Sequence, residues 1–185
     1  MTTPAPLTVA QATAVTRRVT QLSVSVALVL VAAKTAAWLA SGSVAVLASL
    51  ADSGLDLLAS LITLFAVRFA ASPPDAEHRF GHGKAEAFAS LMQGGLVFAS
   101  AALVGREAIA GLMDPRPIQA GGWAMAVMAL SIVLTLALVA AQSRALKQAR
   151  SVAVHGDRAH YAADLASNVA AILGIAGASL LGIYW

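Results

Sequence analysis

Residues 44–70 read VAVLASLADSGLDLLASLITLFAVRFA, an apolar run that two aspartates interrupt. As a helix, this run is long enough to cross about 30 Å of hydrocarbon. Asp52 and Asp56 are spaced i,i+4, so a helix places both side chains on one face. An ionisable side chain at mid-membrane costs about 2.5–3.5 kcal/mol on insertion scales. The run therefore predicts a membrane-spanning helix whose acidic face has a function.

The composition also indicates a membrane protein. Hydrophobic residues make up 59% of the 185-residue chain and charged residues only 11%, whereas a soluble domain carries about 25% charge. The net charge of +3 is divided among several loops rather than gathered in one basic patch. Only three Trp, two Tyr and five Phe are available to stack on bases, so we expect no nucleic acid partner. There is no cysteine, so a bound metal must use imidazole nitrogen and carboxylate oxygen.

Five apolar segments predict an all-α fold, a polytopic membrane helical bundle with residues 1–185 in one transmembrane domain and no soluble domain present. Ser72-Pro73-Pro74 closes the second segment and Asp114-Pro115-Arg116-Pro117 closes the third, because proline does not continue a helix. Each segment is long enough to span the hydrocarbon as a helix. The predicted spans cover residues 22–40, 44–70, 87–113, 120–141 and 152–185.

Basic residues predict the orientation. Arg17 and Arg18 precede the first segment, further Lys and Arg gather in the loops after the second and fourth segments, and the other side carries essentially Arg116. We therefore expect a cytoplasmic amino terminus. The Arg17-Arg18 pair before an apolar run also fits a twin-arginine signal, but Lys34 interrupts that run and four further segments follow, which disfavours a signal.

Two pairs of ionisable residues are expected to lie at the same depth in the membrane. Segment 44–70 runs inward, which puts Asp52 and Asp56 roughly 12 and 18 Å from the outer boundary at 1.5 Å per residue. The second pair, His160 and Asp164, is also spaced i,i+4, and lies roughly 12 and 18 Å from the inner boundary because its segment runs outward. We therefore expect all four side chains to meet near the midplane.

Three carboxylates and one imidazole supply four ligands, which suits a tetrahedral divalent ion of the zinc type. Carboxylates this close together cannot all stay ionised without a cation, so the metal-free cluster is expected to hold protons that an arriving ion displaces. This competition predicts exchange of metal for protons. The alternative is that the Asp and His side chains only bond helices together, as polar groups do in membrane bundles.

Other polar residues lie on the same faces. Ser49 and Ser60 share the stripe of the two aspartates, and Asn168 shares the stripe of His160. These three side chains either line a water path or bond neighbouring helices. Lys34 either extends its amine to the interface or pairs with an acid in the bundle.

The loop after the second segment holds a different cluster. Asp75, His78 and His82 could bind a second metal, with Gly81 and Gly83 allowing the chain to fold around it. Loop histidines are more often simply solvated, so spacing alone leaves both interpretations open.

Three motifs together resemble the cation diffusion facilitators: SVAVLASLADSGLD at 43–56, FGHGKAE at 80–86 and HYAAD at 160–164. The set is most similar to the bacterial zinc and ferrous-iron efflux branch, whose members are proton-coupled exporters that work as homodimers in the inner membrane. Typical members have six spans and a cytoplasmic ferredoxin-like domain, whereas this sequence ends after the fifth segment. It is either a natural short form or part of a longer protein.

The resemblance also implies which residues bind metal. By motif, the transport site is Asp52, Asp56, His160 and Asp164, and a secondary loop site is Asp75, His78 and His82. Manganese-type members of the family tend to carry Asp where His160 stands, so the resemblance favours Zn²⁺ as the cargo, with Cd²⁺ or Fe²⁺ as further cargo.

We therefore expect a secondary transporter in the lipid bilayer, not an enzyme: a Zn²⁺/proton antiporter that alternates access around the midplane site, with no small organic substrate. One alternative is a transport-inactive short form that binds metal as a sensor or partner subunit. A third, an intramembrane metal hydrolase, lacks an H-E-x-x-H run. Asp157 beside Arg158 could act as a catalytic base for such a hydrolase, but we favour the interpretation that these residues form the solvated start of the segment 152–185.

Overall fold

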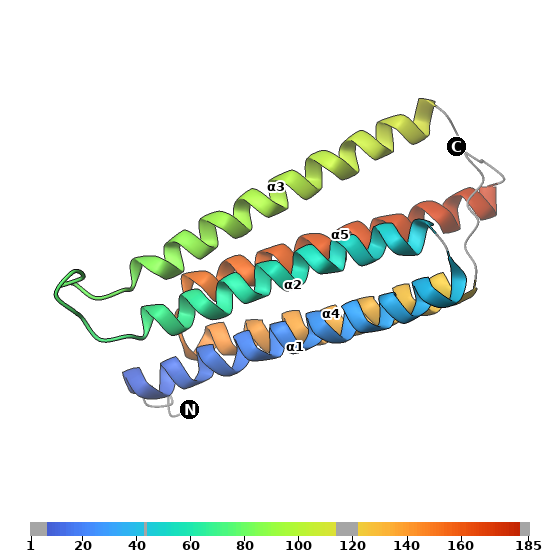
Figure 1. Ribbon diagram of the computed structural model, residues 1–185. Coiled ribbons are helices and arrows are strands. Elements are labelled where there is room, and N and C mark those ends of the chain that lie inside the picture. Colours follow the sequence, from blue (N-terminus) through green and yellow to red (C-terminus); the bar gives the residue numbers. More distant parts are fainter. Residues whose placement is uncertain (1–6, 43, 114–121, 182–185) are drawn as a thin grey trace, which may run out of the picture.

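Five long helices run side by side in the computed structural model, which describes residues 7–42, 44–113 and 122–181 (Figure 1). No strand occurs in these ranges, so the prediction of an all-helical bundle is confirmed. The helices are α1 (Val9–Ser41), α2 (Val44–Ala70), α3 (Lys84–Met113), α4 (Gly122–Gln148) and α5 (Val152–Leu181).

Helix α1 has well-defined ends. Thr8 caps its start, because the Thr8 hydroxyl accepts the Gln11 backbone N–H while the Gln11 side chain accepts the Thr8 backbone N–H. At the other end Gly42 adopts the left-handed conformation at φ 61° and donates its N–H to the Trp38 carbonyl. The chain then turns directly into α2, so α1 and α2 pack as an antiparallel pair.

Four helical stretches are long and apolar enough to cross a membrane among the described residues: Val9–Ser41, Val46–Ala70, Lys84–Arg106 and Ala126–Gln148. Helix α5 is not among them, and its first half carries the charged residues Asp157, Arg158 and Asp164. Its neighbours are α2, α3 and α4, so polar side chains on α5 can find partners on several sides.

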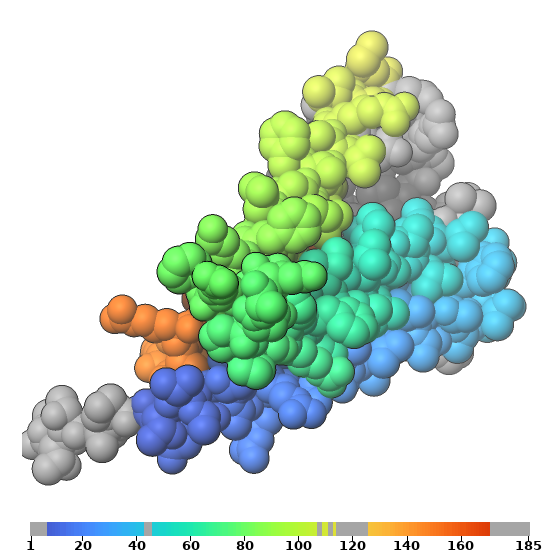
Figure 2. Space-filling view, turned by 60° about the vertical axis from the view of Figure 1, so that its left-hand side comes forward, coloured from blue at the N-terminus to red at the C-terminus, as the bar shows by residue number. Residues whose placement is uncertain are grey.

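Helix α3 packs least against the rest. It starts beside α2 and α5, and its far end stands away from the body of the bundle (Figures 1 and 2). Its near end approaches α5 closely at Gly156, where a Cβ atom would lie 3.1 Å from the Ser90 Cα. Only glycine allows this spacing without moving one of the two backbones.

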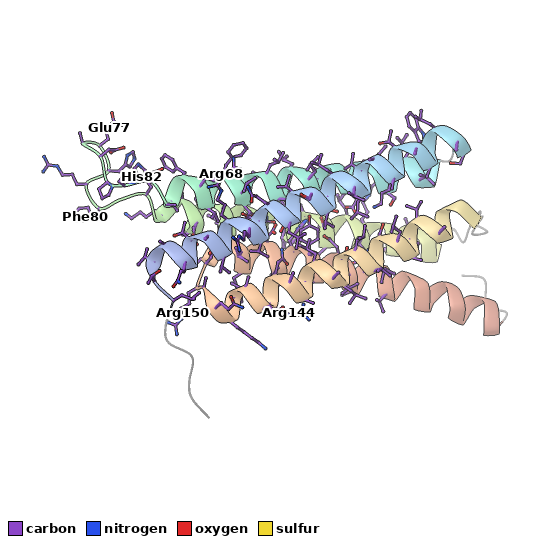
Figure 3. The ribbon with its side chains drawn as sticks, turned by 90° about the horizontal axis from the view of Figure 1, so that it is seen from below. Arg68, Glu77, Phe80, His82, Arg144 and Arg150 are labelled. Atoms are coloured by element: carbon purple, nitrogen blue, oxygen red, sulfur yellow. The ribbon has the colours of Figure 1, made fainter. Side chains whose placement is uncertain are left out.

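The interior of the described bundle is unusually polar. Its apolar clusters are small: one joins Val19, Ala145 and Val154, and the other joins α2, α3 and α5. Arg68 and Arg150 lie toward the same end as the loop of residues 71–83 (Figure 3). Away from that end, buried hydroxyl, amide and carboxylate groups occupy much of the space between helices.

Candidate metal centre

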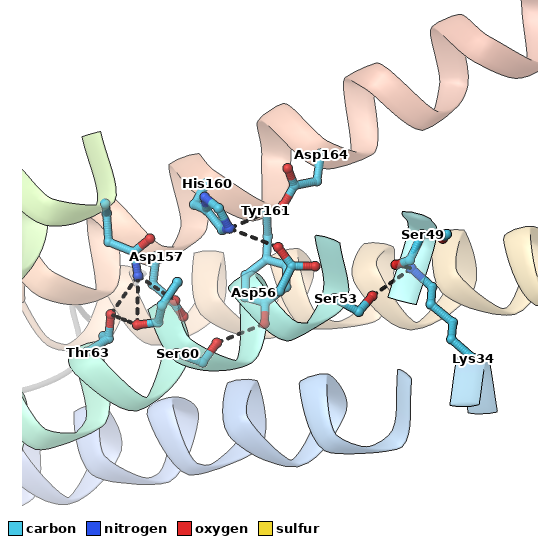
Figure 4. A network of polar contacts seen from close by, with 12 residues as sticks. Lys34, Ser49, Ser53, Asp56, Ser60, Thr63, Asp157, His160, Tyr161 and Asp164 are labelled. Carbon is cyan, nitrogen blue, oxygen red and sulfur yellow. Dashed lines mark hydrogen bonds and ion pairs between the residues drawn. The ribbon is translucent and has the colours of Figure 1, made fainter. Parts of the chain in front are cut away.

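Helices α2 and α5 bring together three of the four predicted ligands of the transport site. The His160 Nε2 lies 3.0 Å from the Asp56 Oδ1 and 3.4 Å from the Asp164 Oδ2 (Figure 4). Asp56 is 7% exposed and His160 2% exposed. One ligand atom from each residue lies within 4.8 Å of the other two. This spacing lets a single small cation contact all three side chains. We call these three residues the midplane cluster.

The electrostatics of the midplane cluster favour a bound cation. One imidazole nitrogen faces two carboxylates: it hydrogen bonds to the Asp56 Oδ1, and the Asp164 Oδ2 lies slightly farther away. The His160 Nδ1 is buried and has no hydrogen-bond partner among the described residues. Two carboxylates in a poorly solvated space repel each other, and a divalent ion relieves this repulsion better than one proton does.

Asp52 does not join the midplane cluster. It is exposed and lies outside the group whose ligand atoms are within 4.8 Å of one another. Asp52 is one helical turn from Asp56 on the same face of α2. Among the described residues, the imidazole nitrogen of His160 that faces α2 lies against Asp56 and Asp164 rather than against Asp52.

Lys34 matches neither predicted alternative. Its side chain is buried at 7% exposure, so it does not reach the interface, and no carboxylate oxygen lies within 4.0 Å of its Nζ among the described residues. Instead, Nζ donates to the Ser53 Oγ at 2.6 Å and the Ser49 carbonyl at 3.1 Å, crossing from α1 to α2. The amine is therefore neutralised by dipoles and by the more distant acids of the site.

Ser49, Ser60 and Asn168, which were predicted either to line a water path or to bond neighbouring helices, differ in their surroundings. Ser60 is fully buried and shares a hydrogen bond of 2.8 Å with the Tyr161 hydroxyl, so it bonds α2 to α5. Ser49 and Asn168 instead line a cavity of about 130 Å³ together with Lys34. The cavity lies on the α1–α2 turn side of the midplane cluster, because Ser49 precedes Asp56 on α2.

Asp157 is not the solvated helix end that the sequence suggested, because it is 0% exposed. Its Oδ1 accepts the Gln93 Nε2 at 3.1 Å, and its Oδ2 accepts the Gln142 Nε2 at 2.7 Å. Gln93 also donates to the Thr63 Oγ1 at 2.8 Å, and Gln142 to the Ser23 Oγ at 3.1 Å. We call these five residues the amide node. Its signal in the sequence is a glutamine inside each of two apolar helices, Gln93 in α3 and Gln142 in α4.

The loop side chains converge as the resemblance implies. The His78 Nδ1 lies 3.2 Å from the Asp75 Oδ1, and the His82 Nε2 lies 3.2 Å from the Asp75 Oδ2. Gly81 takes the left-handed conformation at φ 80°, which only glycine adopts readily, whereas Gly83 does not. Three ligand atoms again lie within 4.8 Å of one another, so the residues fit a divalent ion.

Asp75 is prepared for such an ion. The backbone N–H groups of His78 and Glu77 donate to its Oδ1 at 2.6 and 3.0 Å, and mainly the first of these bonds holds the pKa of Asp75 below its ordinary range. The carboxylate therefore stays ionised. The Phe69 ring packs on His82 with centroids 4.3 Å apart, which fixes the plane of that imidazole.

Glu86 ties this loop region to α5. Its Oε2 accepts the Ser151 hydroxyl at 2.7 Å and the Val152 backbone N–H at 3.0 Å. Glu86 lies in the first turn of α3, and Val152 is the first residue of α5. A carboxylate at a helix start satisfies a free N–H and favours the helix dipole. No local pattern predicts this contact, because the partners are far apart along the chain.

A long bundle with a buried cluster of carboxylates and imidazole is the architecture of a membrane protein that handles cations. Residues 20–185 match the family profile of the cation efflux transmembrane domain, and the chain belongs to this family.

Curated relatives agree with the family. The chain is 44% identical over 163 residues to the cation-efflux pump FieF of Shewanella oneidensis, covering 88% of this chain and 55% of that protein. It is 40% identical over 149 residues to the cation-efflux pump FieF of Klebsiella pneumoniae, covering 80% of this chain and 48% of the relative. The chain thus spans about half the length of these relatives.

Proposed function

We propose that this chain is the membrane part of an exporter that moves Zn²⁺ from the cytoplasm outward in exchange for protons. The observation that carries the proposal is the midplane cluster, in which the His160 imidazole lies within 3.4 Å of carboxylates from two helices. The named relatives are cation-efflux pumps, which supports outward transport of a cation. One nitrogen and several carboxylate oxygens are ligands that Zn²⁺ accepts readily.

Asp52 is the proposed fourth ligand. A change of its side-chain rotamer moves the carboxylate along the face of α2 that Asp56 shares, without moving the backbone. A divalent cation supplies the attraction for that change, because its charge draws in a further carboxylate. Cadmium and ferrous iron fit the same donor set and are proposed as further cargo.

Exchange follows from competition for the same atoms. When Zn²⁺ binds, the proton between His160 and the carboxylates must leave, because the ion uses the same Nε2 and Oδ atoms. When the ion leaves on the far side, protons return to the cluster. A bundle that alternates access around such a site couples efflux of metal to entry of protons.

The membrane arrangement is part of the proposal. The loop of residues 71–83, Arg68 and Arg150 gather at one end of the bundle, which we assign to the cytoplasm in an inner membrane. This assignment makes the amino terminus cytoplasmic and puts the Asp75, His78 and His82 site there as a second metal site. A homodimer is proposed from the resemblance to the family.

Zinc flux into proteoliposomes with an imposed pH gradient tests the function. We expect Zn²⁺ uptake that Asp56→Asn and His160→Ala each abolish, while Glu77→Gln, an exposed loop carboxylate, leaves it intact. Uptake that persists in both cluster variants would contradict the proposed site. Equilibrium Zn²⁺ binding that depends on His160, without any pH-driven flux, would instead support the sensor or partner-subunit alternative.

A further inference from the structure

Asp157 is a buried carboxylate without a cationic partner. It is 0% exposed, and no Lys or Arg nitrogen lies within 4.0 Å of it among the described residues. Among the described residues, its side chain accepts hydrogen bonds from the neutral amides of Gln93 and Gln142. Removing a carboxylate from water without a counter-ion is unfavourable by several kcal/mol, and in membrane proteins such groups mark ion pathways.

The two glutamines of the amide node have unused binding capacity. The Gln93 Oε1 and the Gln142 Oε1 are both buried and have no hydrogen-bond partner among the described residues. Each oxygen shares its amide carbon with the nitrogen that faces Asp157, so half a turn of the amide exchanges the two atoms. Such a rotation would direct two carbonyl oxygens to the position that the amide hydrogens now occupy.

The resulting donor set consists only of oxygen. It comprises the Asp157 carboxylate, two amide oxygens, and the nearby hydroxyls of Thr63 and Ser23. Carboxylate and carbonyl oxygens are the ligands that hard divalent cations such as Mn²⁺ and Mg²⁺ prefer. Zn²⁺ also accepts oxygen, but imidazole gives it a stronger ligand. The amide node therefore suits transient rather than tight binding of zinc.

The amide node lies next to the midplane cluster, on the side of the bundle assigned to the cytoplasm. Asp157 precedes His160 by three residues on α5, a rise of about 4.5 Å. Side chains from all five helices meet at the node: Ser23 on α1, Thr63 on α2, Gln93 on α3, Gln142 on α4 and Asp157 on α5. An ion that approaches His160 from the cytoplasm between these helices must pass these groups.

We propose that the amide node is a second, oxygen-only cation-binding position, which a divalent ion occupies before it reaches the midplane cluster. The inference rests on the proposed function for the direction of entry. The ion replaces the two amide hydrogens at the carboxylate, and both glutamines rotate to present oxygen.

Binding of Mn²⁺ to the purified chain in detergent tests the position directly. The background variant carries Asp56→Asn, Asp164→Asn and His82→Ala, which removes the two other sites, and bound Mn²⁺ is measured from the loss of the free-ion EPR signal. We expect the background variant to bind one Mn²⁺. Adding Asp157→Asn should weaken this Mn²⁺ binding by about tenfold or more, which is the usual effect of substitutions around a metal site. Adding Glu77→Gln to the background should change nothing.

Two results would overturn the proposal: a background that binds no Mn²⁺, or Mn²⁺ binding that Asp157→Asn leaves unchanged. If Asp157→Asn does not fold, as judged by gel filtration and circular dichroism, Gln142→Met replaces it. That variant keeps the carboxylate and the Gln93 bond but removes one amide oxygen, and it should also weaken Mn²⁺ binding. Unchanged binding in Gln142→Met would overturn the proposal equally.

Zinc flux separates a binding position from a purely structural one. We expect Asp157→Asn to raise the KM for cytoplasmic Zn²⁺ more than it lowers the maximal rate, because it removes a loading step. An unchanged KM with a lower maximal rate would mean that the node only holds helices together. Failure of the proposed function has a different signature, namely flux that is insensitive to Asp56→Asn and His160→Ala, whatever the Mn²⁺ titration gives.

Discussion

The hydrogen bond between Ser60 and Tyr161 should show strong coupling between α2 and α5. The two hydroxyl oxygens are 2.8 Å apart, the side chains are 0% and 1% exposed, and neither has another hydrogen-bond partner among the described residues. Tyr161→Phe leaves the Ser60 hydroxyl unsatisfied, and Ser60→Ala does the same to Tyr161. Each change is expected to lower the free energy of unfolding by about 1–3 kcal/mol.

The double variant is the sharper measurement. Because Tyr161→Phe combined with Ser60→Ala removes both polar groups, its loss should be smaller than the sum of the two single losses, with a coupling energy of about 0.6–1.7 kcal/mol. For a chain of this length, 1 kcal/mol corresponds to about 2–4 °C in the midpoint of thermal unfolding. The assay is thermal unfolding of the four proteins in one detergent. Strictly additive losses would refute the coupling.

Three further predictions concern the loop of residues 71–83, α3 and α1. Glu86→Ala should lower the free energy of unfolding by about 0.5–2 kcal/mol, as for loss of a helix cap, and Glu86→Gln should recover part of it in thermal unfolding. In calorimetric titrations of Zn²⁺ into the proposed loop site, the loss of affinity caused by Asp75→Asn should persist as the pH is lowered to the ordinary pKa of an aspartate. The reason is that the pKa of Asp75 lies below its ordinary value, so its contribution is present above that value and is lost only at still lower pH. Lys34→Met removes a buried positive charge near the acids of the transport site, so equilibrium Zn²⁺ binding there should tighten; weaker binding would contradict this.

The local pattern of the sequence was enough to predict the helices. The predicted segment 44–70 has the bounds of α2, because a turn at Gly42 and a prolyl break at Pro73 flank the apolar run. By contrast, α1 begins at Val9, well before the predicted segment 22–40. The early turns of α1 are more polar, and a search for hydrocarbon-spanning runs overlooks them.

Helical periodicity predicted which side chains share a face of one helix, but not which side chains of two helices meet. Spacing of i,i+4 puts Asp52 with Asp56 and His160 with Asp164, and the structure joins the last three of these residues. Which carboxylate meets the imidazole depends on how α2 and α5 are rotated, and that depends on packing between helices. The burial of Asp157 likewise depends on amides from α3 and α4, which are distant in the sequence. Its neighbours in the sequence are charged and typical of a helix end, so they indicated that Asp157 is exposed to solvent.

Because α3 is attached mainly at one end, a small tilt there displaces its other end by a larger distance. Several contacts fix its first turns to α5: the Glu86 carboxylate accepts the Ser151 hydroxyl and the Val152 N–H, Ser90 lies close to Gly156, and the Gln93 amide donates to Asp157. The remainder has few neighbours, and a helix of 30 residues is about 45 Å long. A tilt of about 5° at the fixed end therefore displaces the far end by about 4 Å. Small rearrangements beside the loop of residues 71–83 would thus be magnified at the opposite end of the bundle.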